Sequence, residues 1–243
     1  MVAEKKIDPR GAGLRAELLK LADEELMVGH ILTSLAGWGP ELEINLVLSS
    51  AGQEELGHAR LFYSMLYGDD SDAINAAIYR RDAPEFRSCA LAERYAEDWG
   101  ELVVKQYLYD TADDYRLTAL ASAGMDPAAI EGVRAEERFQ REFWSYWFQR
   151  IASAGIPARE RLQRALTSLW PLTGALFEVE NGVSGNRAAL SGAREAWRDS
   201  VRLHCAELGL ELPDTATTEA DGDGRKRVLA ELRSVHDDAP GQW

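Results

Sequence analysis

The segment QEELGHAR places a carboxylate and an imidazole at a spacing that suits metal binding. Glu55 and His58 stand three residues apart, so both side chains project from one face of a helix. Carboxylates chelate or bridge metal ions, and a neutral imidazole nitrogen is a good donor to iron. A single pair of this kind often arises by chance. It therefore predicts a metal site only where other helices bring further carboxylates to the same height.

A second carboxylate lies at a matching height across the first expected turn. Residues 37–40, GWGP, predict a turn between a helix over residues 14–35 and a helix over 40–67. Glu25 lies 12 residues before Gly37, and Glu55 lies 15 residues after Pro40. With a rise of ~1.5 Å per residue, the two levels in an antiparallel hairpin differ by about one turn. Apolar neighbours predict that Glu25 is buried, where a carboxylate needs a partner.

The second expected hairpin repeats this arrangement. Residues 124–126 predict a turn between helices over 86–122 and 127–153. Asp110 lies 14 residues before Gly124, and Glu137 lies 11 residues after Asp126, with Gln140 three positions further on. The predicted metal ligands are therefore Glu25, Glu55, His58, Asp110 and Glu137. Three further residues are candidates for a place at the metal or beside it: Gln140, Asp114 and Glu101.

Acidic residues are frequent in this chain, so the helical phase stays open at this point. Glu24, Glu54 and Glu136 each precede one of the chosen glutamates by one residue. On the third helix, Glu97 and Glu101 compete with Asp110. A shift by one residue would point a different carboxylate into the bundle.

The elements that must position these side chains are predicted to be helices throughout. Sustained period-two alternation is absent, while helical periodicity is present almost everywhere. Short turns between long helices favour antiparallel neighbours in a bundle. We expect an all-α chain divided into a tail over 1–13, a bundle over 14–210, and an acidic linker, short helix and tail over 211–243. The remaining predicted helices cover residues 73–79, 158–177, 187–208 and 225–235.

Composition excludes several classes of function. The 243 residues carry a net charge of −14, which repels the phosphates of nucleic acids. No apolar run reaches the ~20 residues that a membrane-spanning helix needs, and the N-terminus lacks the apolar core of a secretory signal. Two cysteines, far apart in sequence, indicate neither a disulfide framework nor a cysteine zinc site. We expect a soluble cytoplasmic protein.

Several segments resemble, in order, the oxygenase subunits of phenylacetate degradation. They are GWGPELEINLVLSSAGQEELGHAR, KQYLYDTADDY, EERFQREFW, LWPLTGALFE and the tail PGQW. This family comprises the A and C subunits of phenylacetyl-CoA epoxidase, within the ferritin-like di-iron superfamily. The similarity covers nearly the whole chain and implies a ferritin-like four-helix bundle with additional C-terminal helices.

The resemblance also implies a ligand set and marks one departure from it. The ligands of the catalytic A subunit fall on the five residues predicted above. The sixth ligand of that subunit, a second histidine, falls on Gln140, whose carbonyl oxygen is a weaker donor to iron. The C subunit is a structural partner that has largely lost these ligands, and the later segments of this chain resemble it.

Two functions follow from the resemblance. The first is a non-haem di-iron monooxygenase, with two irons, that activates O2 to epoxidise or hydroxylate a small substrate such as an aromatic acyl-CoA thioester. A separate reductase would supply electrons, because no flavin, nicotinamide or iron–sulfur motif is found here. The second is a non-catalytic structural subunit of a multicomponent ring-epoxidase complex. Either function implies a ferritin-like partner subunit or a homo-oligomer.

Overall fold

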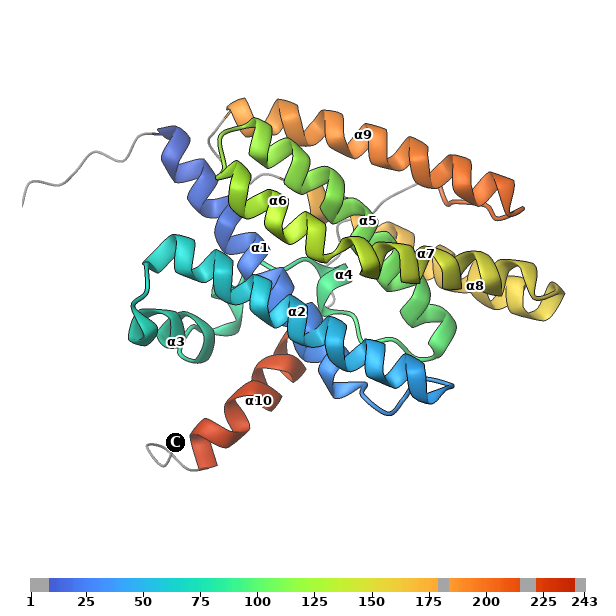
Figure 1. The fold of residues 1–243 in the computed structure, drawn as a ribbon, viewed down its shortest axis with the longest axis horizontal. Coiled ribbons are helices and arrows are strands. Elements are labelled where there is room, and N and C mark those ends of the chain that lie inside the picture. Colours follow the sequence, from blue (N-terminus) through green and yellow to red (C-terminus); the bar gives the residue numbers. More distant parts are fainter. Residues whose placement is uncertain (1–8, 179–183, 215–221, 239–243) are drawn as a thin grey trace, which may run out of the picture.

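Two antiparallel helical hairpins form the centre of the molecule. The computed structural model describes residues 9–178, 184–214 and 222–238, and these contain helices and no strand. The first hairpin joins α1 (Pro9–Ser34) to α2 (Leu42–Tyr67). The second joins α5 (Trp99–Ser122) to α6 (Pro127–Glu136), which α7 (Arg138–Ser153) continues (Figure 1). The arrangement confirms the predicted all-α, ferritin-like bundle.

Additional helices pack around this centre. α9 lies along α5 on one side of the bundle, and α8 packs beside α5 and α7 (Figure 1). α10 contacts α1 and α4, and buries Val228 and Leu229 there. The bounds of these elements are α3 (Ser71–Tyr79), η1 (Ala83–Glu85), α4 (Ala90–Glu93), α8 (Ile156–Leu169), η2 (Trp170–Phe177), α9 (Ser184–Glu207) and α10 (Gly222–Asp238).

Two glycines bring the backbones of α1 and α2 into direct contact. A Cβ atom on Gly29 would lie 2.9 Å from the backbone nitrogen of Leu56. One on Gly52 would lie 2.8 Å from the backbone nitrogen of Thr33. Such distances exclude any side chain at either position, so both residues must be glycine for the helices to meet so closely. The contact lies about one turn from Glu25 on α1 and from Glu55 on α2.

The third and fifth predicted helices differ from the structure. The predicted helix over 86–122 is wrong in its first part, because residues 94–98 are not helical and α5 begins only at Trp99. Asp98 starts it as an N-cap, accepting a hydrogen bond from the Glu101 backbone N–H at 2.9 Å. The predicted helix over 158–177 ends as an α-helix at Leu169 and continues as 3-10 helix. Pro171 has no N–H to continue the α-helical bonding.

The predicted helix over 127–153 is interrupted at Glu137, one of the predicted metal ligands. Glu137 separates α6 from α7, although its N–H still bonds to the Val133 carbonyl at 2.9 Å and its own carbonyl accepts from Arg141 at 3.0 Å. The helix axis therefore continues through a local distortion.

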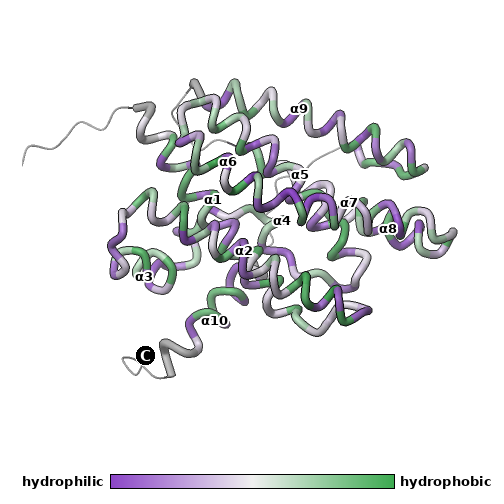
Figure 2. The backbone as a smooth tube through the Cα atoms, in the orientation of Figure 1, coloured by the Kyte–Doolittle hydropathy of each residue, from purple (hydrophilic) through white to green (hydrophobic). Residues whose placement is uncertain are grey.

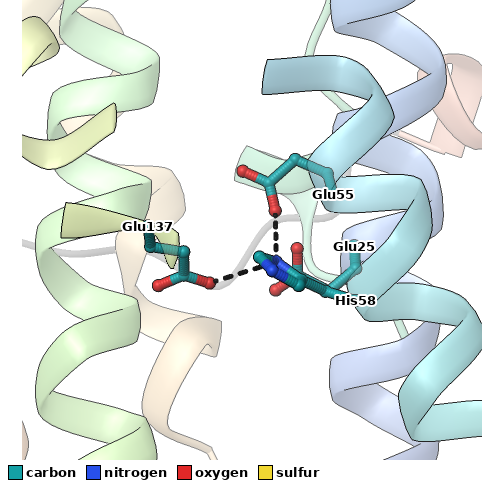
Figure 3. A group of neighbouring side chains, drawn as sticks. All are labelled: Glu25, Glu55, His58 and Glu137. Atoms are coloured by element: carbon teal, nitrogen blue, oxygen red, sulfur yellow. Dashed lines mark ion pairs between the residues drawn. The ribbon is translucent and has the colours of Figure 1, made fainter. Parts of the chain in front are cut away.

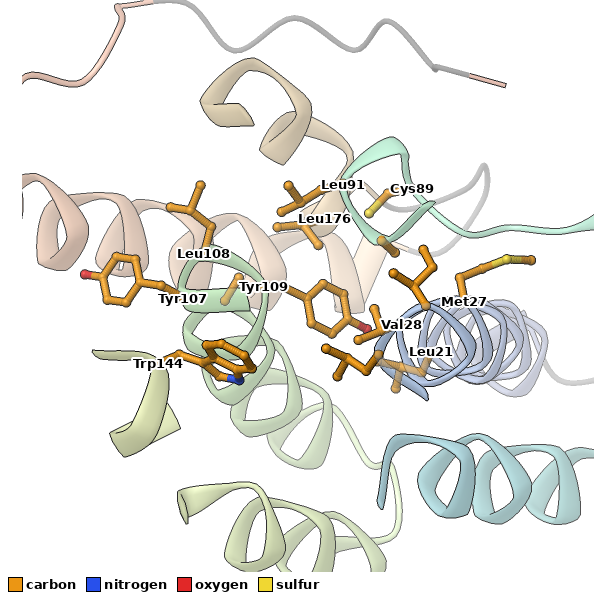
Figure 4. Close-up of a cluster of buried hydrophobic side chains, with 14 of the residues drawn as sticks. Leu21, Met27, Val28, Cys89, Leu91, Tyr107, Leu108, Tyr109, Trp144 and Leu176 are labelled. Atoms are coloured by element: carbon orange, nitrogen blue, oxygen red, sulfur yellow. The ribbon is translucent and has the colours of Figure 1, made fainter. Parts of the chain in front are cut away.

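The core combines apolar packing with an unusual number of buried polar side chains. Hydrophobic and hydrophilic residues are interspersed along the helices (Figure 2). Tyr109 of α5 points toward Leu21 and Val28 of α1, with Trp144 of α7 nearby (Figure 4). The buried charged or amide side chains of the four central helices include Glu24, Glu25, Glu55, His58, Asp110, Asp113, Arg116, Glu137 and Gln140. Such groups rarely stay buried without partners, so their arrangement locates the candidate site.

Parts of the sequence-based prediction lie outside the described residues. These are residues 1–8 of the predicted N-terminal tail, residues 215–221 of the predicted acidic linker and the tail PGQW at 240–243. The division of the chain at residues 13 and 210 stays a prediction. None of the helices in the described part of the chain combines the length and the apolar composition needed to cross a membrane.

Candidate metal centre

Four buried side chains from both hairpins converge at one point in the bundle. Glu25 comes from α1, Glu55 and His58 from α2, and Glu137 from the junction of α6 and α7. Each offers one ligand atom, and these atoms all lie within 4.8 Å of one another. His58 Nδ1 lies 3.5 Å from Glu55 Oε2 and 3.6 Å from Glu137 Oε1. Glu137 reaches the group from the side opposite α1 and α2 (Figure 3).

Three atoms of this group have no hydrogen-bond partner among the described residues. They are Glu25 Oε2, Glu55 Oε2 and His58 Nδ1, and all are buried. A buried polar atom without a partner costs roughly 1–3 kcal/mol, so proteins rarely leave several in one place. A cation between them would satisfy all three. Three carboxylates and one imidazole nitrogen are donors that suit a divalent transition-metal ion such as iron.

Burial and mutual repulsion disfavour the charged forms of these carboxyls. Burial raises the pKa of Glu25 well above its ordinary value, and the charge of Glu55 raises it further. Burial likewise raises the pKa of Glu137, with the charge of Asp113 as the next cause. The pKa of Glu55 is raised for the same main reason. A bound cation would reverse this preference, because it stabilises the carboxylates.

Two polar pairs link α2 to α6 and α7 beside this group. His58 Nε2 lies 3.0 Å from Glu136 Oε2. One turn away, Gln140 Nε2 donates to Glu54 Oε2 at 3.0 Å. The two pairs follow an antiparallel register, because position 54 faces position 140 and position 58 faces position 136. In each pair a nitrogen-bearing side chain bonds to a glutamate on the facing helix. The bond at Nε2 leaves His58 Nδ1 free to face the carboxylates, as is typical of metal-ligating histidines.

The structure resolves the helical phase that the sequence left open. Glu24 points away from the group, accepting a hydrogen bond from Arg116 Nη2 at 2.6 Å and another from the Cys89 backbone N–H at 3.2 Å. Glu54 and Glu136 lie in the polar pairs outside the group. In each pair of neighbouring glutamates, 24/25, 54/55 and 136/137, the second residue is therefore the one that points into the group.

Asp110 is buried but does not belong to the group of four. Its Oδ1 lies 3.5 Å from Gln106 Nε2, and its Oδ2 has no partner among the described residues. It is close enough for its charge to raise the pKa of Glu55 and Glu137. The structure thus places this predicted ligand near the group without completing the set.

Asp113 is a buried acid that the predicted ligand set omits. Neither of its carboxylate oxygens has a hydrogen-bond partner among the described residues, and Arg116 Nη1 lies 3.4 Å from Oδ1. Its charge raises the pKa of Glu25, Glu55 and Glu137. The signal available in the sequence was its position three residues after Asp110, on the same helix face.

Asp114 and Glu101, the other candidates, lie elsewhere. Asp114 accepts from Arg134 Nε at 2.9 Å and lies 3.5 Å from Arg141 Nη2. Arg141 Nη1 in turn lies 3.4 Å from Glu137 Oε2, so Asp114 reaches the group only through Arg141. Glu101 accepts from Arg94 Nε at 3.0 Å in the first turn of α5.

The described residues fit one metal ion better than a pair. The group of four supplies donors for a single ion. A second ion would need Asp110 and a donor at position 140. Gln140 has no ring nitrogen to offer as histidine would, and its amide nitrogen donates a hydrogen bond to Glu54. The side-chain carbonyl of Gln140 is buried without a partner among the described residues, and is the donor that this position offers.

Comparison with known proteins agrees with the resemblance found in the sequence. The family described as phenylacetic acid catabolic protein matches residues 3–243. A curated relative is the C subunit of 1,2-phenylacetyl-CoA epoxidase from Escherichia coli (strain K12). It is 28% identical over 250 residues, which cover 94% of this chain and 98% of the relative. The match extends over nearly all of both proteins, and the chain therefore belongs to the phenylacetic acid catabolic protein family.

Proposed function

We propose that this chain is a ferritin-like subunit of an oxygenase complex of the phenylacetyl-CoA epoxidase type, and that it binds iron at Glu25, Glu55, His58 and Glu137. The observation that carries the proposal is the convergence of three buried atoms without partners among the described residues, Glu25 Oε2, Glu55 Oε2 and His58 Nδ1. The epoxidase subunit named among the relatives supports the type of complex.

Iron at this position would supply the activation of O2 for epoxidation or hydroxylation of a small substrate, such as an aromatic acyl-CoA thioester. The chain's own residues prepare the site. Glu136 orients the His58 ring through Nε2, and Arg141 holds the outer oxygen of Glu137. Tyr109 donates its hydroxyl to Glu25 Oε1 at 3.3 Å, which fixes that carboxylate. Electrons would come from a separate reductase. A second iron would need Asp110 together with a donor at position 140, where the amide nitrogen of Gln140 is bonded to Glu54.

Metal analysis of matched variants tests the proposal. Glu55→Ala removes a converging carboxylate, whereas Glu43→Ala changes an exposed glutamate on the same helix. We expect purified wild-type protein and the Glu43→Ala variant to contain iron, and the Glu55→Ala variant to contain none. Wild-type protein that stays metal-free in iron-replete cells and after anaerobic addition of Fe(II) would contradict the proposal.

The second candidate is a structural subunit without its own chemistry. Two observations favour it: the curated relative is a C subunit, and Gln140 stands where a second histidine is expected. Co-expression of Glu55→Ala with the catalytic partner subunit separates the candidates. If the variant complex assembles and turns over at the wild-type rate, this chain serves as a scaffold. If the complex assembles but loses turnover, its metal is needed.

A further inference from the structure

The outward side of α2 is nearly free of charge, and leucines lie at both of its ends. α2 lies at the outside of the bundle, over α1 (Figure 1). At 3.6 residues per turn, the well-exposed residues of α2 fall on one side of the helix, which we call the α2 stripe. They are Leu42, Glu43, Leu46, Ser50, Gln53, Gly57, Arg60 and Leu61.

The composition of the α2 stripe indicates a contact surface. Glu43 and Arg60 are its only charged residues, so the stripe is neutral on a chain whose net charge is −14. Eight large apolar side chains are well exposed in the described chain, and three of them, Leu42, Leu46 and Leu61, lie on the stripe. Apolar side chains gathered on one exposed surface are typical of protein–protein contacts.

The α2 stripe is complementary to itself when a second copy of α2 runs antiparallel to it. We place a two-fold axis at the level midway between residues 51 and 52. Each position of one copy then lies level with the position of the other copy that is equally far beyond the axis. The level pairs are 42 with 61, 43 with 60, 46 with 57, and 50 with 53, so every residue of the stripe has a partner.

The uncharged pairs fit one another in size and polarity. Leu46 of one copy meets Gly57 of the other, where a Cβ would have no atom within 4 Å, so the surface there has room for a leucine. Leu42 lies level with Leu61 of the other copy, and these two give an apolar contact at each end. Beside the axis, the hydroxyl and amide of the 50–53 pair supply hydrogen-bonding groups to each other.

The charged pair decides between the possible arrangements. Glu43 lies level with Arg60 of the other copy, and the two-fold axis repeats this pair at the opposite end. Neither side chain forms an ion pair with another residue in the described part of the chain. Parallel stripes would instead set Glu43 against Glu43 and Arg60 against Arg60, which is repulsive. The charges therefore favour the antiparallel arrangement of two identical chains.

We propose that this chain forms a two-fold symmetric homodimer in which the two α2 stripes pack antiparallel. Phe139 of α7 extends the apolar contact, because it is 61% exposed and shares with Leu46 the lining of an open pocket of about 230 Å³. Glu55 and His58 are buried and point into the bundle. The dimer thus forms without using any of the four candidate metal ligands.

Sedimentation velocity of the full chain over a range of concentrations tests the dimer. Wild-type protein should show a monomer–dimer equilibrium. Leu46→Lys places a charge from each copy in the contact and should leave the chain monomeric. Leu203→Lys is the matched control, because Leu203 lies on α9 and both leucines are 64% exposed; this variant should dimerise as wild type does. Circular dichroism checks that each variant is folded.

A charge swap tests the antiparallel register. Glu43→Arg and Arg60→Glu each replace two opposite-charge pairs by two like-charge pairs, and each should raise the dimer Kd about tenfold. The double variant, Glu43→Arg with Arg60→Glu, restores opposite charges and should regain nearly the wild-type affinity.

Three results would overturn the homodimer. They are a wild-type chain that stays monomeric, even if it binds a different subunit through this face; a dimer that Leu46→Lys leaves intact; and a double variant as weak as the single ones. Iron content should be the same in all of these variants, so their outcome is independent of the proposed metal site.

Discussion

Gln140 and Glu54 meet across the seam between α2 and α7, with the amide nitrogen of Gln140 donating to Glu54 Oε2 at 3.0 Å. The contact reproduces, one turn away, the bond between His58 and Glu136. Position 140 thus has the partner that a histidine would have there. The side chain differs from histidine in the donor that it can present to a metal.

Replacing Gln140 with histidine should complete a second metal position. The new ring can bond to Glu54 through Nε2, which leaves Nδ1 directed inward as in His58. We expect the iron content to rise from about one to about two per chain, because a nitrogen donor would join Asp110. Elemental analysis against protein concentration measures this, with Gln149→His on the exposed face of α7 as the control. Unchanged stoichiometry would show that position 140 lies outside the metal shell.

Removing the partner of His58 should weaken metal binding without removing a ligand. In Glu136→Gln the acceptor for His58 Nε2 is no longer charged, so the ring is held less firmly. We expect iron affinity to fall by about 10- to 100-fold, the usual effect of outer-shell partners. Competition with a chelator measures it, and Glu142→Gln on exposed α7 surface is the control. Equal affinities of the two variants would mean that Glu136 does not orient His58.

Closing the space at Gly52 should separate the helices that carry Glu25 and Glu55. The added Cβ of Gly52→Ala would clash with the Thr33 backbone nitrogen, and we expect a loss of ~1–3 kcal/mol in the free energy of unfolding. Iron content should fall with it. Gly57→Ala is the matched control, since a Cβ there meets nothing within 4 Å and should stabilise α2 by ~0.5–1 kcal/mol. Denaturant unfolding of both variants provides the measurement, and equal stabilities would contradict the close backbone contact.

Lys105 should make stability depend on pH above neutrality. Burial lowers the pKa of Lys105 from 10.5 to about 7, and its side-chain nitrogen donates to the Ala92 carbonyl at 3.1 Å. Between about pH 7 and 10.5 the unfolded chain holds a proton that the folded chain has released, so stability rises with pH in this window.

A buried apolar replacement isolates this effect. Lys105→Met should be more stable than wild type at pH 7, and the difference should shrink toward pH 9 by at most ~1.4 kcal/mol per pH unit. Urea unfolding at the two pH values measures it. Lys226→Met, at an exposed lysine, should leave the pH dependence unchanged. A constant difference between wild type and Lys105→Met would show that the buried amine does not titrate there.

The sequence was sufficient for the features that depend on helix geometry. Counting residues from the first turn predicted that Glu25 and Glu55 lie within about one helical turn of each other, and the structure brings them together. The sequence was insufficient to predict which of two neighbouring glutamates points into the bundle. Glu24 differs from Glu25 in its partners, which are Arg116, about 90 residues away in the chain, and the Cys89 backbone N–H. The sequence also failed to predict the break before Trp99. The helical periodicity continues through residues 94–98 and hides the role of Asp98 as an N-cap.

The proposed iron site predicts that the thermal stability of the protein depends on the supply of iron. Without a cation, Glu25, Glu55 and Glu137 are held together against desolvation and mutual repulsion, which lowers the free energy of unfolding. An ion that binds only the folded chain raises the free energy of unfolding. Above its Kd, this increase grows with the logarithm of the free ion concentration. The melting temperature should therefore climb steadily as iron is added, and a cell starved of iron would hold a chain that unfolds and is degraded sooner.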